Sequence, residues 1–181
     1  MGRGTKIAVA VFVGVVLGVV GYFAIAQPIK VLPRVQTAIP FEMSDQNGDV
    51  YRYPDSARPI NMYIVAAGWD DAAIERAEHA IALVHEYLVA EGIEDLIEFA
   101  WITPDPVNDD IHTIRSISAR VPIVQTTGAS FLTGAPTAVR FAVGAGLGIF
   151  VGPPPEEGDR VFYEPALALV DDLGWVRGRY S

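Results

Sequence analysis

The stretch that decides the fold runs from residue 60 to residue 103 and reads INMYIVAAGWDDAAIERAEHAIALVHEYLVAEGIEDLIEFAWIT. It begins and ends with short apolar runs, residues 60–67 and 96–103, which are typical of buried strands. Between them, apolar residues recur at steps of three and four, the spacing of an amphipathic helix: Ile74, Ala77, Ile81, Val84 and Leu88. The aspartates at 70–71 can cap the start of this helix, and Gly92 suits its end. A strand, a helix and a second strand predict a right-handed parallel crossover within an α/β fold.

The flanking sequence adds strands and short helices to this unit. Residues 41–53 alternate around Asn47-Gly48, which favours a hairpin turn because both residues tolerate positive φ. Downstream, the pattern predicts helices over residues 109–120 and 136–143, strands over 146–152, 166–170 and 175–180, and a surface loop over 153–158. A turn at residues 172–174 joins the last two strands, so we expect an α/β domain that ends in a hairpin.

The N-terminal region predicts a membrane anchor. Residues 7–26 carry no charge over 20 positions, and about 20 helical residues span a bilayer core. Arg3 and Lys6 precede this run and all 22 acidic residues follow it, which favours a cytoplasmic N-terminus and an exported domain. We therefore expect a single-pass membrane protein whose domain lies in the periplasm or an equivalent extracytoplasmic space. The alternative is a cleaved signal peptide, because residues 24–26 have the A-x-A form, although the apolar run exceeds the usual length.

These features divide the chain into an anchor (residues 1–27), an extended tether with two prolines (28–39) and a folded domain (40–181). Within the anchor, Gly14, Gly18 and Gly21 form a stripe of small residues that can let another transmembrane helix approach closely. Glycine is also simply common in membrane helices, and the sequence leaves both interpretations open.

Composition excludes several classes of function. Half of the 181 residues are hydrophobic (51%) and 19% are charged, which is unlike a disordered chain. From Val35 onward there are nine arginines, no lysine and 22 acidic residues, a formal net charge of −13, so nucleic acid is not an expected partner. This charge can steer basic partners or simply keep the domain soluble. The chain has no cysteine, which excludes disulfides, thiol nucleophiles and thiolate metal sites on this chain.

Several blocks of the sequence together resemble the Sco/SenC proteins. They occur in the family's order over most of residues 40–180: Phe41…Asp45-Gln46-x-Gly48, Tyr63-Ile64-Val65, Asp105-Pro106-x-x-Asp109, Phe131-Leu132-Thr133-Gly134 and Leu169-Val170-Asp171…Gly174-x-x-Arg177-Gly178-x-Tyr180. The resemblance implies a thioredoxin-like domain with an N-terminal hairpin and a central mixed sheet flanked by helices, behind one transmembrane helix. It also implies a setting in copper delivery or thiol redox chemistry during cytochrome c oxidase assembly.

The sequence departs from this family at the residues that hold copper. The family has a CxxxC motif after its first buried strand and a distal histidine. The alignment places Gly68 and Ala72 at the cysteine positions and Tyr163 near the histidine position. Copper(I) prefers soft sulfur ligands, and these residues supply none. The resemblance therefore carries over the fold and the setting, and not the activity.

Other residues offer little chemistry. Asp105, Asp109, Asp110 and His112 form a polar cluster that could hold Ca²⁺, Mg²⁺ or Zn²⁺ loosely. The favoured interpretation is that Asp109 caps the following helix while the others are solvated. There is no Gly-x-Ser-x-Gly elbow, and the glycines at 144–148 do not match a phosphate-binding fingerprint. We expect no catalytic, cofactor-binding or metal-binding residues, and no enzyme.

The leading hypothesis is a non-catalytic accessory subunit or assembly factor of a respiratory or photosynthetic electron-transfer complex in the membrane. Trp69, on the loop that holds metal in the family, is either an interface residue or part of the core. One alternative is a copper-handling or redox assembly factor that uses non-cysteine ligands or a partner's sulfur. Another is a docking module for a basic c-type cytochrome.

Overall fold

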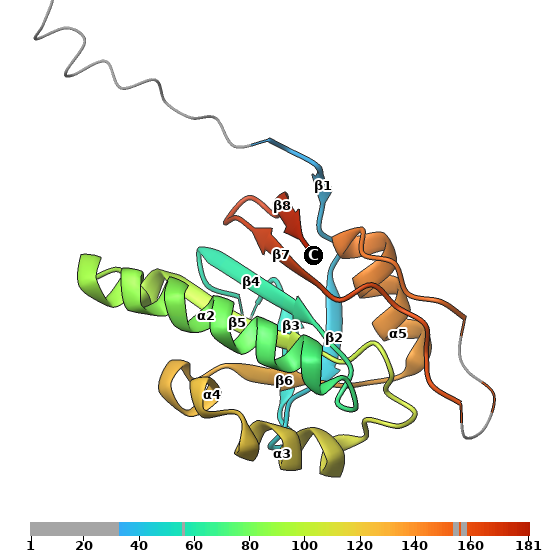
Figure 1. Ribbon diagram of the computed structural model, residues 1–181. Helices are drawn as coiled ribbons and strands as arrows, with labels where there is room; N and C mark the ends of the chain where they lie inside the picture. Colours follow the sequence, from blue (N-terminus) through green and yellow to red (C-terminus); the bar gives the residue numbers. More distant parts are fainter. Residues whose placement is uncertain (1–32, 56, 154–155, 157–158) are drawn as a thin grey trace, which may run out of the picture. The chain divides into compact units, whose positions relative to one another are not determined.

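The computed structural model describes residues 33–55, 57–153, 156 and 159–181 (Figure 1). The predicted membrane span, its alternative cleavage site, and Gly14, Gly18 and Gly21 lie outside these residues. Within the described part, no helix is both long enough and apolar enough to cross a bilayer.

The described chain forms strands and helices in the order that the sequence largely predicts. The strands are β1 (Gln36–Thr37), β2 (Phe41–Ser44), β3 (Val50–Tyr53), β4 (Ile60–Val65), β5 (Ile97–Ile102), β6 (Ser130–Leu132), β7 (Ala166–Val170) and β8 (Trp175–Tyr180). The helices are α2 (Asp71–Glu91), α3 (Ile111–Arg120), α4 (Pro122–Thr127) and α5 (Pro136–Arg140), with a 3-10 turn η1 (Glu94–Leu96) and a π-helical continuation of α5, η2 (Phe141–Leu147).

A mixed sheet is the centre of the domain. Its strand order is β1-β8-β7-β4-β5-β6, with β2 and β3 as a separate hairpin. Strands β4, β5 and β6 run parallel, whereas β7 is antiparallel to both β4 and β8. The predicted strand–helix–strand unit is therefore present, with α2 linking β4 to β5. Because β4 and β5 are parallel, their carboxyl ends lie side by side at the same edge of the sheet.

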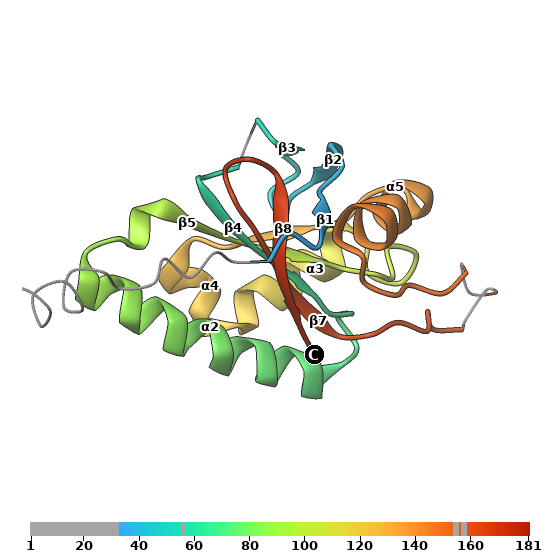
Figure 2. The same cartoon turned by 90° about the horizontal axis from the view of Figure 1, so that it is seen from above.

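Two layers of side chains cover the two faces of this sheet. Helices α2, α3 and α4 lie on one face, and the β2–β3 hairpin with α5 lies on the other (Figure 2). Along β4 the side chains alternate between the layers: Ile64 packs with the helices, while Tyr63 and Val65 pack with the hairpin and α5. Both faces of β4 are thus buried, which explains its continuous apolar run.

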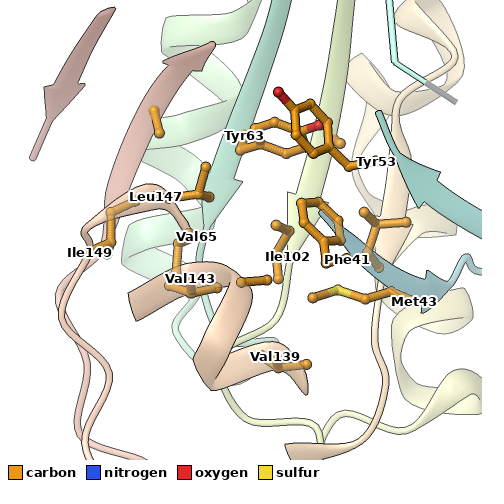
Figure 3. Close-up of a cluster of buried hydrophobic side chains, with 14 of the residues drawn as sticks. Phe41, Met43, Tyr53, Tyr63, Val65, Ile102, Val139, Val143, Leu147 and Ile149 are labelled. Atoms are coloured by element: carbon orange, nitrogen blue, oxygen red, sulfur yellow. The ribbon is translucent and has the colours of Figure 1, made fainter. Parts of the chain in front are cut away.

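The hairpin contributes an aromatic cluster to the core (Figure 3). The ring of Phe41 stacks on Tyr53 with centroids 5.5 Å apart and meets Tyr63 edge to face at 5.7 Å. The hydroxyls of Tyr51 and Tyr63 lie 3.2 Å apart in a buried hydrogen bond. Within the hairpin, buried Phe41 and Met43 flank exposed Glu42 on β2, and buried Tyr51 and Tyr53 flank exposed Arg52 on β3, as the sequence pattern requires.

Two of the family-like blocks have clear structural roles. The side-chain carbonyl of Gln46 accepts a hydrogen bond from the Phe131 N–H at 2.7 Å, which attaches the hairpin turn to the edge strand β6. In the C-terminal hairpin, Asp171 accepts backbone hydrogen bonds within the turn and forms an ion pair with Arg177 at 2.5 Å. Gly174 has φ +77°, a left-handed conformation that suits glycine in this turn.

The prediction of a strand over residues 146–152 is wrong. Residues 141–147 continue α5 as η2, and Gly148, with φ +70°, ends this helix. The apolar residues of the segment fit a helix because Ala142, Val143 and Leu147 all reach the core layer on the hairpin side. Only Val151 pairs, through an isolated bridge to Tyr163.

Other differences from the prediction are smaller. Sequence reasoning missed α4 and β6, which are six and three residues long and too short for a clear periodicity. The segment expected as a tether contributes β1, which pairs with β8. Its Gln36 side chain also donates a hydrogen bond to the Gly146 carbonyl at 2.8 Å.

Candidate functional site

The candidate site lies where three loops meet at one edge of the sheet. Residues 66–70 follow β4 and residues 103–110 follow β5, and these two strands are parallel. Residues 160–165 precede β7, which is antiparallel to β4, so they reach the same edge. The sheet topology therefore brings together Gly68, Trp69, Asp105, Asp109 and Tyr163.

Asp109 connects the first two loops. Its carboxylate Oδ2 accepts hydrogen bonds from the Gly68 N–H at 2.6 Å and from the Thr103 hydroxyl at 2.5 Å. The side chain is almost fully buried, with 2% of its surface exposed. Burial raises the pKa of Asp109 above its usual value, while the hydrogen bonds from Thr103 and Gly68 act in the opposite direction. The residue fixes the loop after β4 to the loop after β5.

A side chain at Gly68 would require neighbouring side chains to move. A Cβ atom there would clash with Cδ1 of Ile117 and would lie 2.7 Å from Oδ1 of Asp109. Ile117 is buried in the core between the sheet and α3. The space in which a cysteine would project at this position is thus occupied by an isoleucine and a hydrogen-bonded carboxylate.

Tyr163 holds the same loop from the other side. Its hydroxyl accepts a hydrogen bond from the Ala67 N–H at 3.1 Å and donates one to Asp70 Oδ2 at 2.8 Å. Burial raises the pKa of the Tyr163 phenol well above its usual value, so the hydroxyl remains a donor. Asp70 also caps α2 by accepting a hydrogen bond from the Ala73 N–H at 3.0 Å. The Tyr163 hydroxyl therefore holds the loop of residues 66–70 at both of its ends.

Trp69 is half-buried and links all three loops. Its indole N–H donates to Asp105 Oδ2 at 3.0 Å, and its ring meets Tyr163 edge to face with centroids 5.9 Å apart. The guanidinium of Arg160 lies over the same ring, 4.6 Å from its centroid. The sequence left open whether Trp69 is a core or an interface residue. In the structure one part of its side chain packs against the core and the rest is exposed to solvent.

Asp105 is the least satisfied group of the site. It is 1% exposed, and its Oδ2 accepts hydrogen bonds from Trp69 and from Asn108 Nδ2, the latter at 2.9 Å. Its Oδ1 has no hydrogen-bond partner among the described residues. A buried carboxylate oxygen without a hydrogen-bond donor destabilises the folded state, so Oδ1 of Asp105 lowers the free energy of unfolding.

The predicted polar cluster of Asp105, Asp109, Asp110 and His112 does not form a metal site. Asp110 and His112 are exposed, whereas the two other carboxylates are buried in the loop network. In the described part of the chain, no three potential ligand side chains are placed to hold a metal ion. The interpretation that Asp109 caps the helix is also wrong, because Asp110 accepts the capping hydrogen bond from the Thr113 N–H at 2.8 Å.

The residues at the family's copper positions do not fit copper. The Tyr163 hydroxyl accepts a hydrogen bond from the N–H of Ala67, the neighbour of Gly68, and Ala72 is exposed in the first turn of α2. None of them supplies sulfur, the ligand that copper(I) prefers, and the space beside Gly68 is filled.

The polar contacts of this site could not be read from the sequence. The hydrogen bonds between the loops join residues that are 36 to 96 positions apart, such as Trp69 with Asp105 and Ala67 with Tyr163. The usable signal was the family-like spacing of Asp105 and Asp109, which marked the loop without indicating how the carboxylates are used.

The fold and this loop arrangement define a thioredoxin-like α/β domain. The described structure is similar to yeast Sco1 with copper bound (TM-score 0.67, 16% identity, covering 81% of this chain and 80% of that one). It is also similar to a SCO1/SenC family lipoprotein from Bacillus anthracis (TM-score 0.65, 16% identity, covering 80% and 84%). A third similar structure is BsSco, described as a member of the Sco family of cytochrome c oxidase assembly proteins (TM-score 0.63, 18% identity, covering 83% and 86%).

At the level of sequence, no protein-family model and no curated protein matches the chain. The structural likeness confirms the fold that the resemblance to Sco/SenC proteins predicted, including the central mixed sheet. The chain thus has a Sco-like thioredoxin fold without a cysteine.

Proposed function

We propose that this chain is a non-catalytic, membrane-anchored, Sco-like accessory subunit or assembly factor of a respiratory or photosynthetic electron-transfer complex. The observation that carries the proposal is the filled loop at Gly68. The fold is kept, while the position of a family cysteine is occupied by Ile117 and Asp109.

The polar groups at the loop support a structural role. Asp109, Thr103 and the Gly68 N–H satisfy one another, and Tyr163 satisfies Ala67 and Asp70. Hydrogen bonds of this kind stabilise one loop conformation. They also occupy the Asp109 carboxylate and the Tyr163 hydroxyl, so these groups are not free to take part in a reaction. We therefore expect the domain to act by binding other proteins through its surface, and not by chemistry at the loop after β4.

The membrane setting in the proposal comes from the sequence. The apolar run of residues 7–26, with basic residues before it and all acidic residues after it, favours an anchored domain on the extracytoplasmic side. Such an anchor would keep the domain close to membrane complexes and raise its effective concentration beside them.

The proposal is tested by extraction of the full chain from its native membranes with a mild detergent. We expect it to migrate with the subunits of an electron-transfer complex, at a constant ratio through successive purification steps. A chain that migrates alone as a monomer would contradict the proposal.

A second candidate is docking of a basic c-type cytochrome. The observation that favours it is the net charge of −13 from Val35 onward. Several of these carboxylates are exposed on α2 and the following turn, among them Glu75, Glu86, Glu91 and Asp95. An acidic surface attracts a basic carrier and accelerates its association.

A further inference from the structure

An exposed apolar surface lies beside the candidate site. The side chains of Phe150 and Phe162 are 53% and 77% exposed, and their rings meet edge to face with centroids 5.8 Å apart. Val107, on the loop after β5, is 56% exposed. Its neighbour Asn108 donates a hydrogen bond to the Asp159 carbonyl at 3.0 Å, which ties this loop to the segment that carries Phe162. We call Val107, Phe150, Arg160 and Phe162 the aromatic patch.

The backbone holds the aromatic patch in place. The Gly152 N–H donates to the Phe162 carbonyl at 2.7 Å, and the Glu164 N–H donates to the Phe150 carbonyl at 3.1 Å. Along this short ribbon Val161 and Tyr163 are buried, so the residues between and beside them face solvent. The two phenylalanines are therefore displayed by a segment whose alternate side chains are anchored in the domain.

Arg160 adds a positioned cation to the aromatic patch. Its guanidinium lies over Trp69, and Trp69 is itself fixed by Asp105 and Tyr163. Arg160 makes no ion pair with any residue that the structure describes, although the domain has a large excess of carboxylates. A guanidinium held on an aromatic face keeps its in-plane donors available for a carboxylate and loses little conformational freedom on binding.

We infer that the aromatic patch is the surface by which this domain docks on a partner protein, whose apolar surface carries a carboxylate opposite Arg160. This inference rests on the proposed function and names the surface that it uses. Exposed aromatic residues with a positioned arginine are the composition of energetically important interface sites. A lipid surface is disfavoured, because a domain of net charge −13 is repelled by anionic headgroups.

Photo-crosslinking from the full chain in its native membranes tests the inference. A benzophenone amino acid is placed at position 162 and, as a control, at position 87. Tyr87 is an aromatic residue of α2 that is also largely exposed (62%). We expect position 162 to crosslink to one protein subunit, at a segment with apolar residues next to Asp or Glu, and position 87 not to crosslink to it. Crosslinks to lipid alone, no crosslink from position 162, or equal crosslinking from position 87 would overturn the inference.

Two matched substitutions test the energetics. Phe162→Ser and Arg160→Glu should each reduce the amount of co-purified partner about tenfold or more, as expected for central interface residues. Phe141→Ser in η2, at a position that is 53% exposed, and Arg120→Glu on α3 make the same changes at other exposed positions and should retain the partner. The unfolding midpoint of each variant controls for folding. If wild type and all four variants retain the partner equally, the inference fails while the proposed function stands. If wild type retains none, both fail.

Discussion

Gly68→Ala is the substitution that most sharply tests whether the loop is filled. The new Cβ would clash with Cδ1 of Ile117 and press on the Asp109 carboxylate at 2.7 Å. Overpacking of this kind costs about 1–3 kcal/mol, and disturbance of the short Gly68–Asp109 hydrogen bond adds to it. We therefore expect a loss of about 2–3 kcal/mol in the free energy of unfolding.

The matched control is Gly144→Ala in η2. A Cβ at Gly144 has no heavy atom within 4 Å, and the residue is in a helix, where alanine is favoured over glycine. The control should therefore be neutral or slightly stabilising. Ile117→Val supplies a second control, because it deletes the Cδ1 atom that clashes, at a cost of about 1 kcal/mol on its own.

The two changes at the loop should compensate each other. In the double variant Gly68→Ala/Ile117→Val, we expect about 1 kcal/mol or more of the loss to be recovered, as for residues in direct contact. Urea unfolding of the full chain in mild detergent measures this. The fluorescence of Trp69, beside Gly68, and of Trp101, whose indole donates to the Ala66 carbonyl, reports on the loop. A Gly68→Ala variant as stable as Gly144→Ala, or strictly additive effects in the double variant, would show that Ile117 does not fill the space beside Gly68.

Three further predictions concern the loop and the acidic surface. Tyr163→Phe leaves the buried Ala67 N–H without its acceptor and should lower the free energy of unfolding by about 1–3 kcal/mol in the same urea assay; an unchanged midpoint would count against the role of this hydroxyl. Burial raises the pKa of Asp109 in the folded state above its ordinary value of 3.8. The protonated carboxyl therefore favours the folded state below pH 3.8, and this contribution to the free energy of unfolding is lost as the pH rises through the raised pKa. Asp109→Asn should therefore gain stability relative to wild type as the pH rises above about 3.8, and parallel pH profiles of the two proteins would contradict this. A basic c-type cytochrome should bind the full chain with an affinity that falls steeply with ionic strength in a titration by calorimetry; absence of binding at every salt concentration would remove this candidate.

The sequence predicted the elements whose patterns are long or chemically distinct. Helix α2 is 21 residues long with a regular apolar stripe, and the hairpin turn has the Asn47-Gly48 pair, so both were found. The segment around Gly146 misled the prediction, because alternating glycine and apolar residues resemble a strand when the packing of Val143 and Leu147 in the core is unknown. Tertiary packing overrode the local pattern there.

The candidate site was only partly predictable. The positions of Gly68 and Tyr163 could be located from the resemblance, and the structure joins their two loops through the hydrogen bond from the Ala67 N–H to the Tyr163 hydroxyl. That Ile117, from α3, fills the space beside Gly68 depends on how a helix 49 residues later packs on the sheet. The exposure of Phe150 and Phe162 likewise depends on their ribbon, since apolar residues in a sequence are usually expected in the core.

Copper(I) titration of the purified full chain is the measurement that decides whether this Sco-like domain lacks copper chemistry. The protein is titrated under reducing, anaerobic conditions against a chromogenic copper(I) chelator. We expect the chelator to keep the metal, because Gly68, Ala72 and Tyr163 offer no sulfur and the space at Gly68 is filled. Retention of one copper(I) ion per chain by the protein alone would contradict it.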